Sequence, residues 1–194
     1  MAPMEASAST DEALLRQYAA GDVGAFEQLY ARYELPLWRY ILRHSGDRAA
    51  ADELTQEVWF AVARESSRFR SDGRFRPWVY TLARNRVIDR LRTTHRHASL
   101  DEAPPGGDVP LVDLLADPSA ASPEQQFESA DQAAAIIAAL DRLPRDQREA
   151  FVLQADSGLS VEEIATVTGT RYETAKSRLR YARERLKALL QDYA

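Results

Sequence analysis

The chain has 194 residues, of which 45% are hydrophobic, and this is enough for one or two small globular domains. It contains no cysteine, which excludes disulfides, thiol catalysis and cysteine-ligated zinc. The opening residues MAPMEASASTDEA lack the basic segment and apolar run of a secretory signal, and no stretch approaches the roughly 18 apolar residues of a membrane span. We therefore expect no signal peptide and no membrane insertion.

The formal net charge of −5 conceals blocks of opposite sign. Residues 5–63 hold ten acidic side chains against five arginines, whereas residues 64–96 hold ten arginines against three acids. Residues 99–130 hold seven acids and no base, and residues 171–187 hold seven bases against two acids. Solvated helix faces would explain any one run, but two basic blocks on either side of an acidic one favour surfaces that meet different partners.

Helical periodicity dominates the acidic block 5–63 and the basic block 64–96. The pattern predicts helices over 11–20, 24–43, 48–65 and 76–93, with SSRFRSDGRF as a loop before the last. Pro36 falls inside the second helix and is expected to kink or divide it, and Asp47 is placed to cap the third. The third helix should bury one side, which contains Leu54, Val58, Trp59 and Val62.

The sequence changes character between His95 and about Gln126. Five prolines, a Gly106–Gly107 pair and several serines and aspartates leave no sustained periodicity there. This composition predicts a flexible acidic linker, although the apolar island VPLVDLLAD is long enough to bind locally.

Helices resume after the linker. Residues 127–141 are alanine-rich, and LPRDQREAFVLQAD begins another helix with Pro144 in its first turn. Capping boxes at Ser160 and Thr170 open a short and a long helix, and Gly169 lies in the tight turn between them. This is a helix-turn-helix pattern. With no convincing strand, the expected fold is all-α, with two small helical domains joined by the linker.

The long C-terminal helix is amphipathic. Its predicted core face contains Ala175, Leu179, Ala182, Leu186, Leu189 and Leu190. Lys176 and Arg180 point elsewhere, so this helix has the form that enters a DNA major groove. The alternative is a solvated terminal helix whose cations are favoured by the helix dipole.

The other basic block contains the segment TLARNRVIDRLR, residues 81–92. Arg84 falls inside its apolar arc and is expected to snorkel toward solvent. The preceding loop interleaves Phe69 and Phe75 with four arginines, which is a combination suited to single-stranded nucleic acid, because bases stack on rings while cations follow the backbone. The aromatic side chains could equally belong to the core.

Four segments together resemble sigma factors of bacterial RNA polymerase, specifically the extracytoplasmic-function (ECF) group of the sigma-70 family. They are ADELTQEVWFAVAR, RFRPWVYTLARNRVIDRLR, LPRDQREAFVLQADSGLSVEEIA and ETAKSRLRYARERL, in the order the family requires. The resemblance implies a transcription initiation factor. Its sigma domain 2 would span 10–95, a connector 96–126 and sigma domain 4 127–194. Domain 2 would read and melt the minus-ten promoter element, and domain 4 would read the duplex minus-thirty-five element.

The resemblance also assigns residues. An aromatic ring and an amide at Phe69 and Asn85 match positions that hold a base flipped from the minus-ten strand. The minus-ten residues it implies are Phe69, Trp78, Asn85, Arg86, Arg90 and Arg92. Those for minus-thirty-five DNA are Arg171, Thr174, Lys176, Ser177, Arg178, Arg180 and Tyr181. Those for core polymerase are Asp52, Glu53, Gln56 and Glu57, although a solvated acidic helix face explains the same charges.

The partners implied by the resemblance are core RNA polymerase, through its beta-prime and beta subunits, promoter DNA and an anti-sigma factor. The expected location is the bacterial cytoplasm, at the nucleoid when the chain is bound to polymerase. No cofactor and no metal are expected. One departure concerns Glu173, which stands where the family often has glycine. Its carboxylate fits the capping box, but it could also repel a phosphate or accept from cytosine, so the resemblance leaves the minus-thirty-five sequence open.

Two other functions compete with this interpretation. A stand-alone helix-turn-helix regulator explains the C-terminal half but leaves the first 95 residues without a purpose. An enzyme is disfavoured, because His95 and His97 lie in the predicted linker and neither they nor His44 accompany a serine or cysteine nucleophile.

Overall fold

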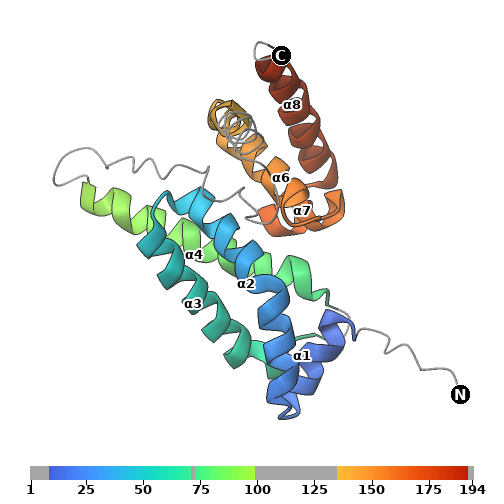
Figure 1. Ribbon diagram of the computed structural model, residues 1–194. Helices are drawn as coiled ribbons and strands as arrows, with labels where there is room; N and C mark the ends of the chain where they lie inside the picture. Colours follow the sequence, from blue (N-terminus) through green and yellow to red (C-terminus); the bar gives the residue numbers. More distant parts are fainter. Residues whose placement is uncertain (1–8, 71–72, 99–134, 192–194) are drawn as a thin grey trace, which may run out of the picture.

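The computed structural model describes residues 9–70, 73–98 and 135–191, and every regular element in these ranges is helical (Figure 1). The elements are α1 (Asp11–Ala19), α2 (Val23–Ser45), α3 (Arg48–Glu65), the 3₁₀ turn η1 (Ser66–Arg68), α4 (Phe75–Ala98), a helical segment over 135–141, α6 (Arg145–Ala155), α7 (Val161–Thr168) and α8 (Tyr172–Gln191). The expected all-α class is confirmed. Apart from residues 96–98, which end α4, the predicted linker lies outside the described residues.

Helices α1 to α4 form an N-terminal unit around α2, which packs against the other three. Their starts follow the local cap chemistry, because the side chains of Thr10, Asp22 and Asp47 each accept a backbone N–H of the first turn. The predicted inner side of α3 is fully buried. No helix in the described ranges has the length and apolarity needed to cross a membrane.

Helix α2 differs from the sequence expectation. It continues through Pro36 as one helix of 23 residues, so it is not divided there. Leu29, Tyr33, Leu37 and Ile41 are buried on both sides of the proline, along one face. Burial of that shared face stabilises the unbroken helix despite the hydrogen bond that proline removes.

The C-terminal unit contains the expected helix-turn-helix. The Ser160 side chain and Glu163 form the predicted capping box, and Gly169 ends α7 at a left-handed φ of 64°. The second predicted box is absent. Helix α8 begins only at Tyr172, and the Thr170 hydroxyl lies 3.0 Å from that of Thr168. The core face of α8 is confirmed, with Ala175, Leu179, Ala182 and Leu186 buried.

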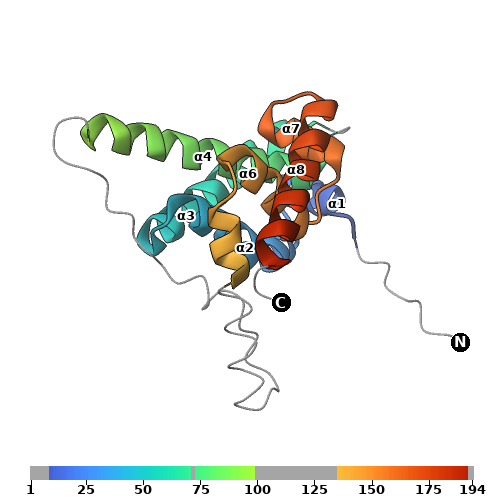
Figure 2. The same cartoon turned by 90° about the horizontal axis from the view of Figure 1, so that it is seen from above.

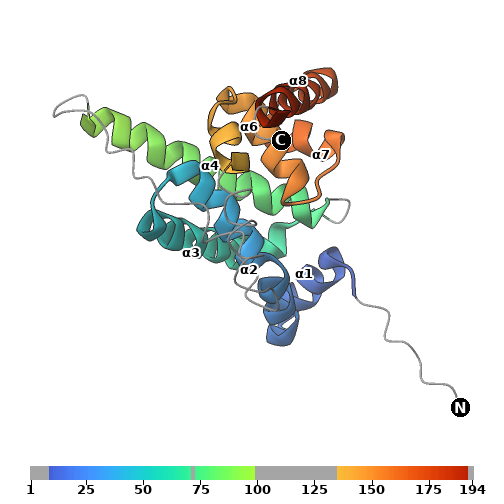
Figure 3. The same cartoon turned by 45° about the horizontal axis from the view of Figure 1, so that its top comes forward.

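The two units are in contact. One hydrophobic cluster runs from Leu14 in α1 to Leu179 in α8, and α7 packs directly on α4 (Figures 1 and 3). Helix α8 points away from the N-terminal unit, and the last turns of α4 extend beyond the C-terminal unit (Figure 2). Helix α4 is therefore covered by the C-terminal unit in its first half only.

Candidate nucleic-acid interface

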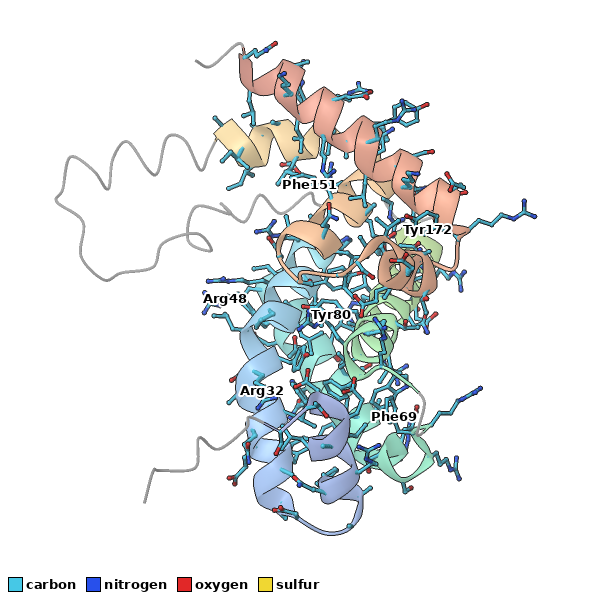
Figure 4. The ribbon with its side chains drawn as sticks, turned by 90° about the vertical axis from the view of Figure 1, so that its right-hand side faces the viewer. Arg32, Arg48, Phe69, Tyr80, Phe151 and Tyr172 are labelled. Atoms are coloured by element: carbon cyan, nitrogen blue, oxygen red, sulfur yellow. The ribbon has the colours of Figure 1, made fainter. Side chains whose placement is uncertain are left out.

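An open cavity of about 870 Å³ lies beside the start of α4. Phe69, labelled in Figure 4, follows η1 and lines this cavity. The centre of its ring lies 5.0 Å from that of Trp78. Both rings are partly exposed, whereas Phe75 behind them is fully buried and belongs to the core. The cavity also has a cationic rim, formed by Arg64, Arg68, Arg70 and Arg74. A flat aromatic group can pack against these rings while arginines face a negatively charged chain.

Gly73 lies close to the Phe69 ring. A Cβ at Gly73 would lie 3.1 Å from Phe69 Cζ and 3.1 Å from the carbonyl oxygen of Arg70. Any larger residue would therefore push the ring or the loop backbone. Sequence reasoning missed this residue, and its only signal was the glycine beside an aromatic-rich loop.

The other minus-ten residues expected from the sequence lie along α4, and their charges are already partnered. Asn85 is exposed. Arg86 Nε lies 3.3 Å from Glu57 Oε2, and Arg90 Nη1 lies 3.4 Å from Glu53 Oε2. Arg92 pairs with Asp89 on its own helix at 3.8 Å. The structure thus brings two expected polymerase-binding acids of α3 against two expected promoter-binding arginines.

Arg84 behaves differently from the expectation that it would snorkel to solvent. Its Nε and Nη2 donate to Glu149 of α6 at 2.8 and 3.4 Å. The Tyr40 hydroxyl donates to the same carboxylate at 3.3 Å, and only 6% of Glu149 is exposed. The expectation was wrong because the C-terminal unit covers this part of α4 and supplies a counter-charge. Sequence reasoning missed Glu149 entirely.

The surroundings of this ion pair are buried. Burial raises the pKa of the Tyr40 hydroxyl well above its usual value, and Glu149 beside it adds to the effect. Burial also lowers the pKa of the His44 imidazole, although its hydrogen bond to the Tyr40 carbonyl opposes the shift. Both groups are therefore neutral near pH 7.

A second hollow, of about 1100 Å³, lies between α1, α2 and α3. Asp52, Glu53 and Gln56 line it, and Asp52 accepts from Trp38 Nε1 at 2.6 Å. Glu57, one turn of α3 after Glu53, is exposed. Apolar side chains face solvent in the same hollow, with Phe60 67% and Leu35 50% exposed. Phe60 was missed, although two adjacent aromatics on a helix, Trp59 and Phe60, cannot both face one core.

The residues expected to contact minus-thirty-five DNA lie on α8 and directly before it. Arg171, Thr174, Lys176, Arg180 and Tyr181 are exposed, and Ser177 and Arg178 are partly exposed. The Lys176 ammonium lies 5.8 Å from the centre of the Tyr172 ring, and the Arg180 guanidinium lies 4.6 Å from the centre of the Tyr181 ring. Arg178 pairs with Asp146 of α6. Glu173 is exposed in the first turn, so it remains accessible to a ligand on this face.

The residues expected from the sequence therefore form three surfaces. The aromatic cavity and α4 make one, the acidic and apolar hollow on α3 makes another, and α8 makes the third. Across residues 9–70, 73–98 and 135–191, no group of three or more potential ligands is arranged to hold a metal ion.

Descriptions of known families match two stretches of the chain. The description of sigma-70 region 2 matches residues 29–97, and that of sigma-70 region 4 matches residues 133–186. RNA polymerase sigma factor NccH of Alcaligenes xylosoxydans xylosoxydans is 31% identical over 190 residues, covering 95% of this chain and 96% of its own. ECF RNA polymerase sigma factor SigM of Mycobacterium tuberculosis is 33% identical over 181 residues, covering 93% and 85%.

Solved structures share the fold. Sigma factor RpoE of Bartonella quintana, in complex with the anti-sigma factor NepR, superposes with a TM-score of 0.65 at 28% identity, covering 86% of this chain and 96% of that one. CnrH, in complex with the cytosolic domain of CnrY, gives a TM-score of 0.66 at 24% identity, covering 96% of this chain.

Proposed function

The chain belongs to the ECF group of the sigma-70 family, and from that premise we propose which of its surfaces performs each step of promoter recognition. As a sigma factor it is a transcription initiation factor that directs RNA polymerase to promoters. The proposal divides it into domain 2 over 10–95, a connector over 96–126 and domain 4 over 127–194.

The aromatic cavity takes a base flipped out of the minus-ten strand. The observation that carries this step is the pairing of two partly exposed rings, Phe69 and Trp78, at the edge of a cavity with a cationic rim. Asn85 supplies amide groups for a base edge, and Arg86, Arg90 and Arg92 face the phosphates.

Melting needs no catalytic group in this scheme, so we assign the chain no enzymatic activity. Stacking on Phe69 and contact with the separated strand are made only after the duplex opens. The protein therefore binds the open strand better than the duplex and shifts the equilibrium by that difference.

Helix α8 reads the minus-thirty-five duplex from the major groove. The side chains proposed to contact DNA lie at its start and in its first three turns, and its other side is buried in the C-terminal unit. The residues proposed to contact DNA are Arg171, Thr174, Lys176, Ser177, Arg178, Arg180 and Tyr181.

Core polymerase, through its beta-prime and beta subunits, occupies the hollow on α3. Asp52, Glu53, Gln56 and Glu57 provide charge and hydrogen-bond acceptors, and Phe60 and Leu35 provide apolar area that is exposed in the free chain. Such a patch rimmed by acids fits a basic partner surface with apolar contacts at its centre.

We also propose an anti-sigma partner and a cytoplasmic location, at the nucleoid when polymerase is bound. The support for the anti-sigma partner is the 28% identity to RpoE of Bartonella quintana, which was solved with the anti-sigma factor NepR. The support for the location is membership of a family that acts on RNA polymerase.

Run-off transcription with purified core polymerase and a genomic fragment library tests the function. We expect start sites that require both core and this chain. Nanomolar, sequence-specific binding to duplex DNA by the chain alone at physiological salt would instead support a stand-alone helix-turn-helix regulator.

A further inference from the structure

A further cavity, of about 540 Å³, lies where α1, α2, α4 and the segment after α6 meet. Most of its lining side chains are polar or charged, from Asp11 and Glu12 of α1 to Asp156 and Ser157 after α6. Its volume is in the range of about 300–1,000 Å³ that is usual for small-molecule sites. It shares no lining residue with the aromatic cavity or with the hollow on α3, so the functions proposed above do not account for it.

Two hydroxyl groups of this cavity are buried and unpaired. Tyr80 of α4, labelled in Figure 4, is only 1% exposed. Neither its hydroxyl nor that of Ser157 makes a hydrogen bond of normal geometry within the described residues. Burial raises the pKa of Tyr80 to about 12, although nearby Ser157 opposes the shift. The Tyr80 hydroxyl therefore keeps its proton, and an unpaired buried donor of this kind is unfavourable unless a ligand accepts from it.

The Arg76 guanidinium is a third donor at the same place. Its Nε donates to the Tyr33 hydroxyl at 3.4 Å, and among the described residues no carboxylate lies close enough to form an ion pair with it. A Cβ at Gly158 would lie 3.6 Å from Arg76 Nη1, so the guanidinium reaches the segment that carries Ser157. Its positive charge also opposes the rise in the pKa of Tyr80. The cation and the two hydroxyls are therefore close together.

The acids around the cavity have partners of their own. Asp11 accepts from the Arg32 guanidinium at 2.7 Å, and Glu12 accepts the first backbone N–H of α4 at 2.9 Å. Asp156 pairs with Arg43 of α2 at 3.1 Å. The groups that lack partners are therefore hydrogen-bond donors, which a ligand with oxygen acceptors would satisfy. A carboxylate or a phosphate suits them best, because a hydrogen bond between arginine and an anion is shorter and stronger than a neutral one.

We propose that this cavity binds a small oxyanion, the carboxylate or phosphate group of a metabolite, through Arg76, Tyr80 and Ser157. The guanidinium donates to the anion from the side of α4, and the two hydroxyls donate from within the cavity. The site requires neither promoter DNA nor core polymerase, so the proposal is independent of the proposed function. Because the cavity is separate from the aromatic cavity and from the hollow on α3, a ligand can occupy it without displacing either proposed partner.

Two probe anions test the site. Inorganic phosphate and acetate are titrated separately into the full chain at constant ionic strength, with chloride as the balancing anion, and binding is measured by calorimetry and by thermal unfolding. We expect saturable binding of at least one probe, with a rise in Tm of roughly 5–10 °C at a probe concentration 100 times its Kd. Binding of phosphate alone assigns a phosphorylated ligand, and binding of acetate alone assigns a carboxylate. The absence of saturable binding for both probes would refute the site.

Tyr80→Phe separates ligand binding from folding. It removes only the hydroxyl, which has no partner in the free chain, so the Tm without probe should stay the same or rise slightly. The Kd of the probe should increase about 10- to 150-fold, as expected for a lost hydrogen bond to a charged group. Tyr30→Phe is the matched control, because the Tyr30 hydroxyl donates to Glu34 outside this cavity. A Tyr80→Phe chain that binds the probe as tightly as the parent would overturn the proposal.

Ser157→Ala and Arg76→Gln test the other two donors. Each should increase the Kd of the probe, and Arg76→Gln should do so by at least as much as Tyr80→Phe, because it removes the charge as well as the donors. Lys187→Gln, at an exposed position on α8, removes the same charge outside the cavity and should leave the Kd unchanged. Equal weakening by Arg76→Gln and Lys187→Gln would show that the probe responds to overall charge, and would refute the site.

Discussion

The two basic helices of this protein hold their positive charge in different ways. On α4, Arg84, Arg86 and Arg90 each pair with a carboxylate from another helix: Glu149, Glu57 and Glu53. On α8, Lys176 and Arg180 lie over tyrosine rings of their own helix. Sequence alone made these helices look alike, as amphipathic segments rich in arginine.

The difference follows from how many neighbours each helix has. Helix α4 packs on α2 and α3 and is covered by α7, so acids from several elements reach its arginines. Helix α8 packs on α6 and α7 with one face, and its other face is largely exposed in the part of the chain that the structure describes. A DNA phosphate must therefore compete with internal carboxylates on α4, whereas on α8 it meets cations that are mostly ready to bind.

The largest expected effect concerns the aromatic cavity beside α4. Phe69→Ala should reduce open-complex formation by about 5- to 150-fold, from a stacking loss of about 1–3 kcal/mol, and change closed-complex binding little. Footprinting and permanganate reactivity separate the two complexes. Phe69→Trp keeps a stacking ring and should retain most activity. An equal loss in both complexes would remove Phe69 from the base pocket.

A pre-melted promoter distinguishes variants of the aromatic cavity from variants of α8. A bubble template supplies separated strands but no ring, so it should rescue α8 variants partly and Phe69→Ala poorly. Gly73→Ala should resemble a mild Phe69 variant, because its Cβ would crowd that ring. If α8 and cavity variants respond alike to the bubble, the assignment of separate roles to the two regions is wrong.

The next largest expected effect concerns the hollow on α3 that is proposed to bind core polymerase. Asp52 bonds to Trp38 and not to an α4 arginine, so Asp52→Arg should weaken core association by tenfold or more, about 1.4 kcal/mol or more, with free-chain oligonucleotide binding nearly unchanged. Co-purification with core and fluorescence anisotropy measure the two quantities. Glu27→Arg, at an exposed position on α2 outside the hollow, is the control. Unchanged association would exclude Asp52 from the interface.

The cations of α8 and α4 can be compared charge for charge. Lys176→Ala and Arg180→Ala should each lower the salt slope of duplex binding by about one, as expected for a lost phosphate contact. Arg86→Ala in the free chain should lower the slope for a single-stranded oligonucleotide by less, because Glu57 already neutralises part of that charge. Equal slopes per charge on both helices would contradict the comparison.

The smallest effect comes from the acids that mask α4. Glu57→Gln should strengthen oligonucleotide binding by the free chain only about 1.4- to 5-fold, since half-exposed ion pairs are worth about 0.2–1 kcal/mol. In the polymerase complex, where Glu57 is proposed to contact core, this gain should vanish. Asp52→Asn carries the same charge change without an arginine partner and should give a smaller gain. If the gain is the same with core polymerase bound, the Glu57–Arg86 ion pair persists in that complex and Glu57 does not contact core.

The sequence by itself determined the helices, most of their caps and their buried faces. The Asp47 cap, the Ser160 capping box, the Gly169 turn and the inner face of α8 depend on residues within a few positions of one another, so local chemistry and helical period are sufficient. The four quoted segments likewise identified the family, because their residues and order are properties of the chain.

Only the tertiary structure decided what each exposed or charged side chain meets. Pro36 stays inside one helix because the packed face on both sides of it is shared. Phe60 faces solvent because Trp59 takes the core position, and Gly73 matters because the loop folds it against Phe69. Glu149 and Arg84 are 65 residues apart in the chain, and neither has a local signal for the other. Such pairings depend on which surfaces pack together, and the free energy that selects them is summed over the whole interface.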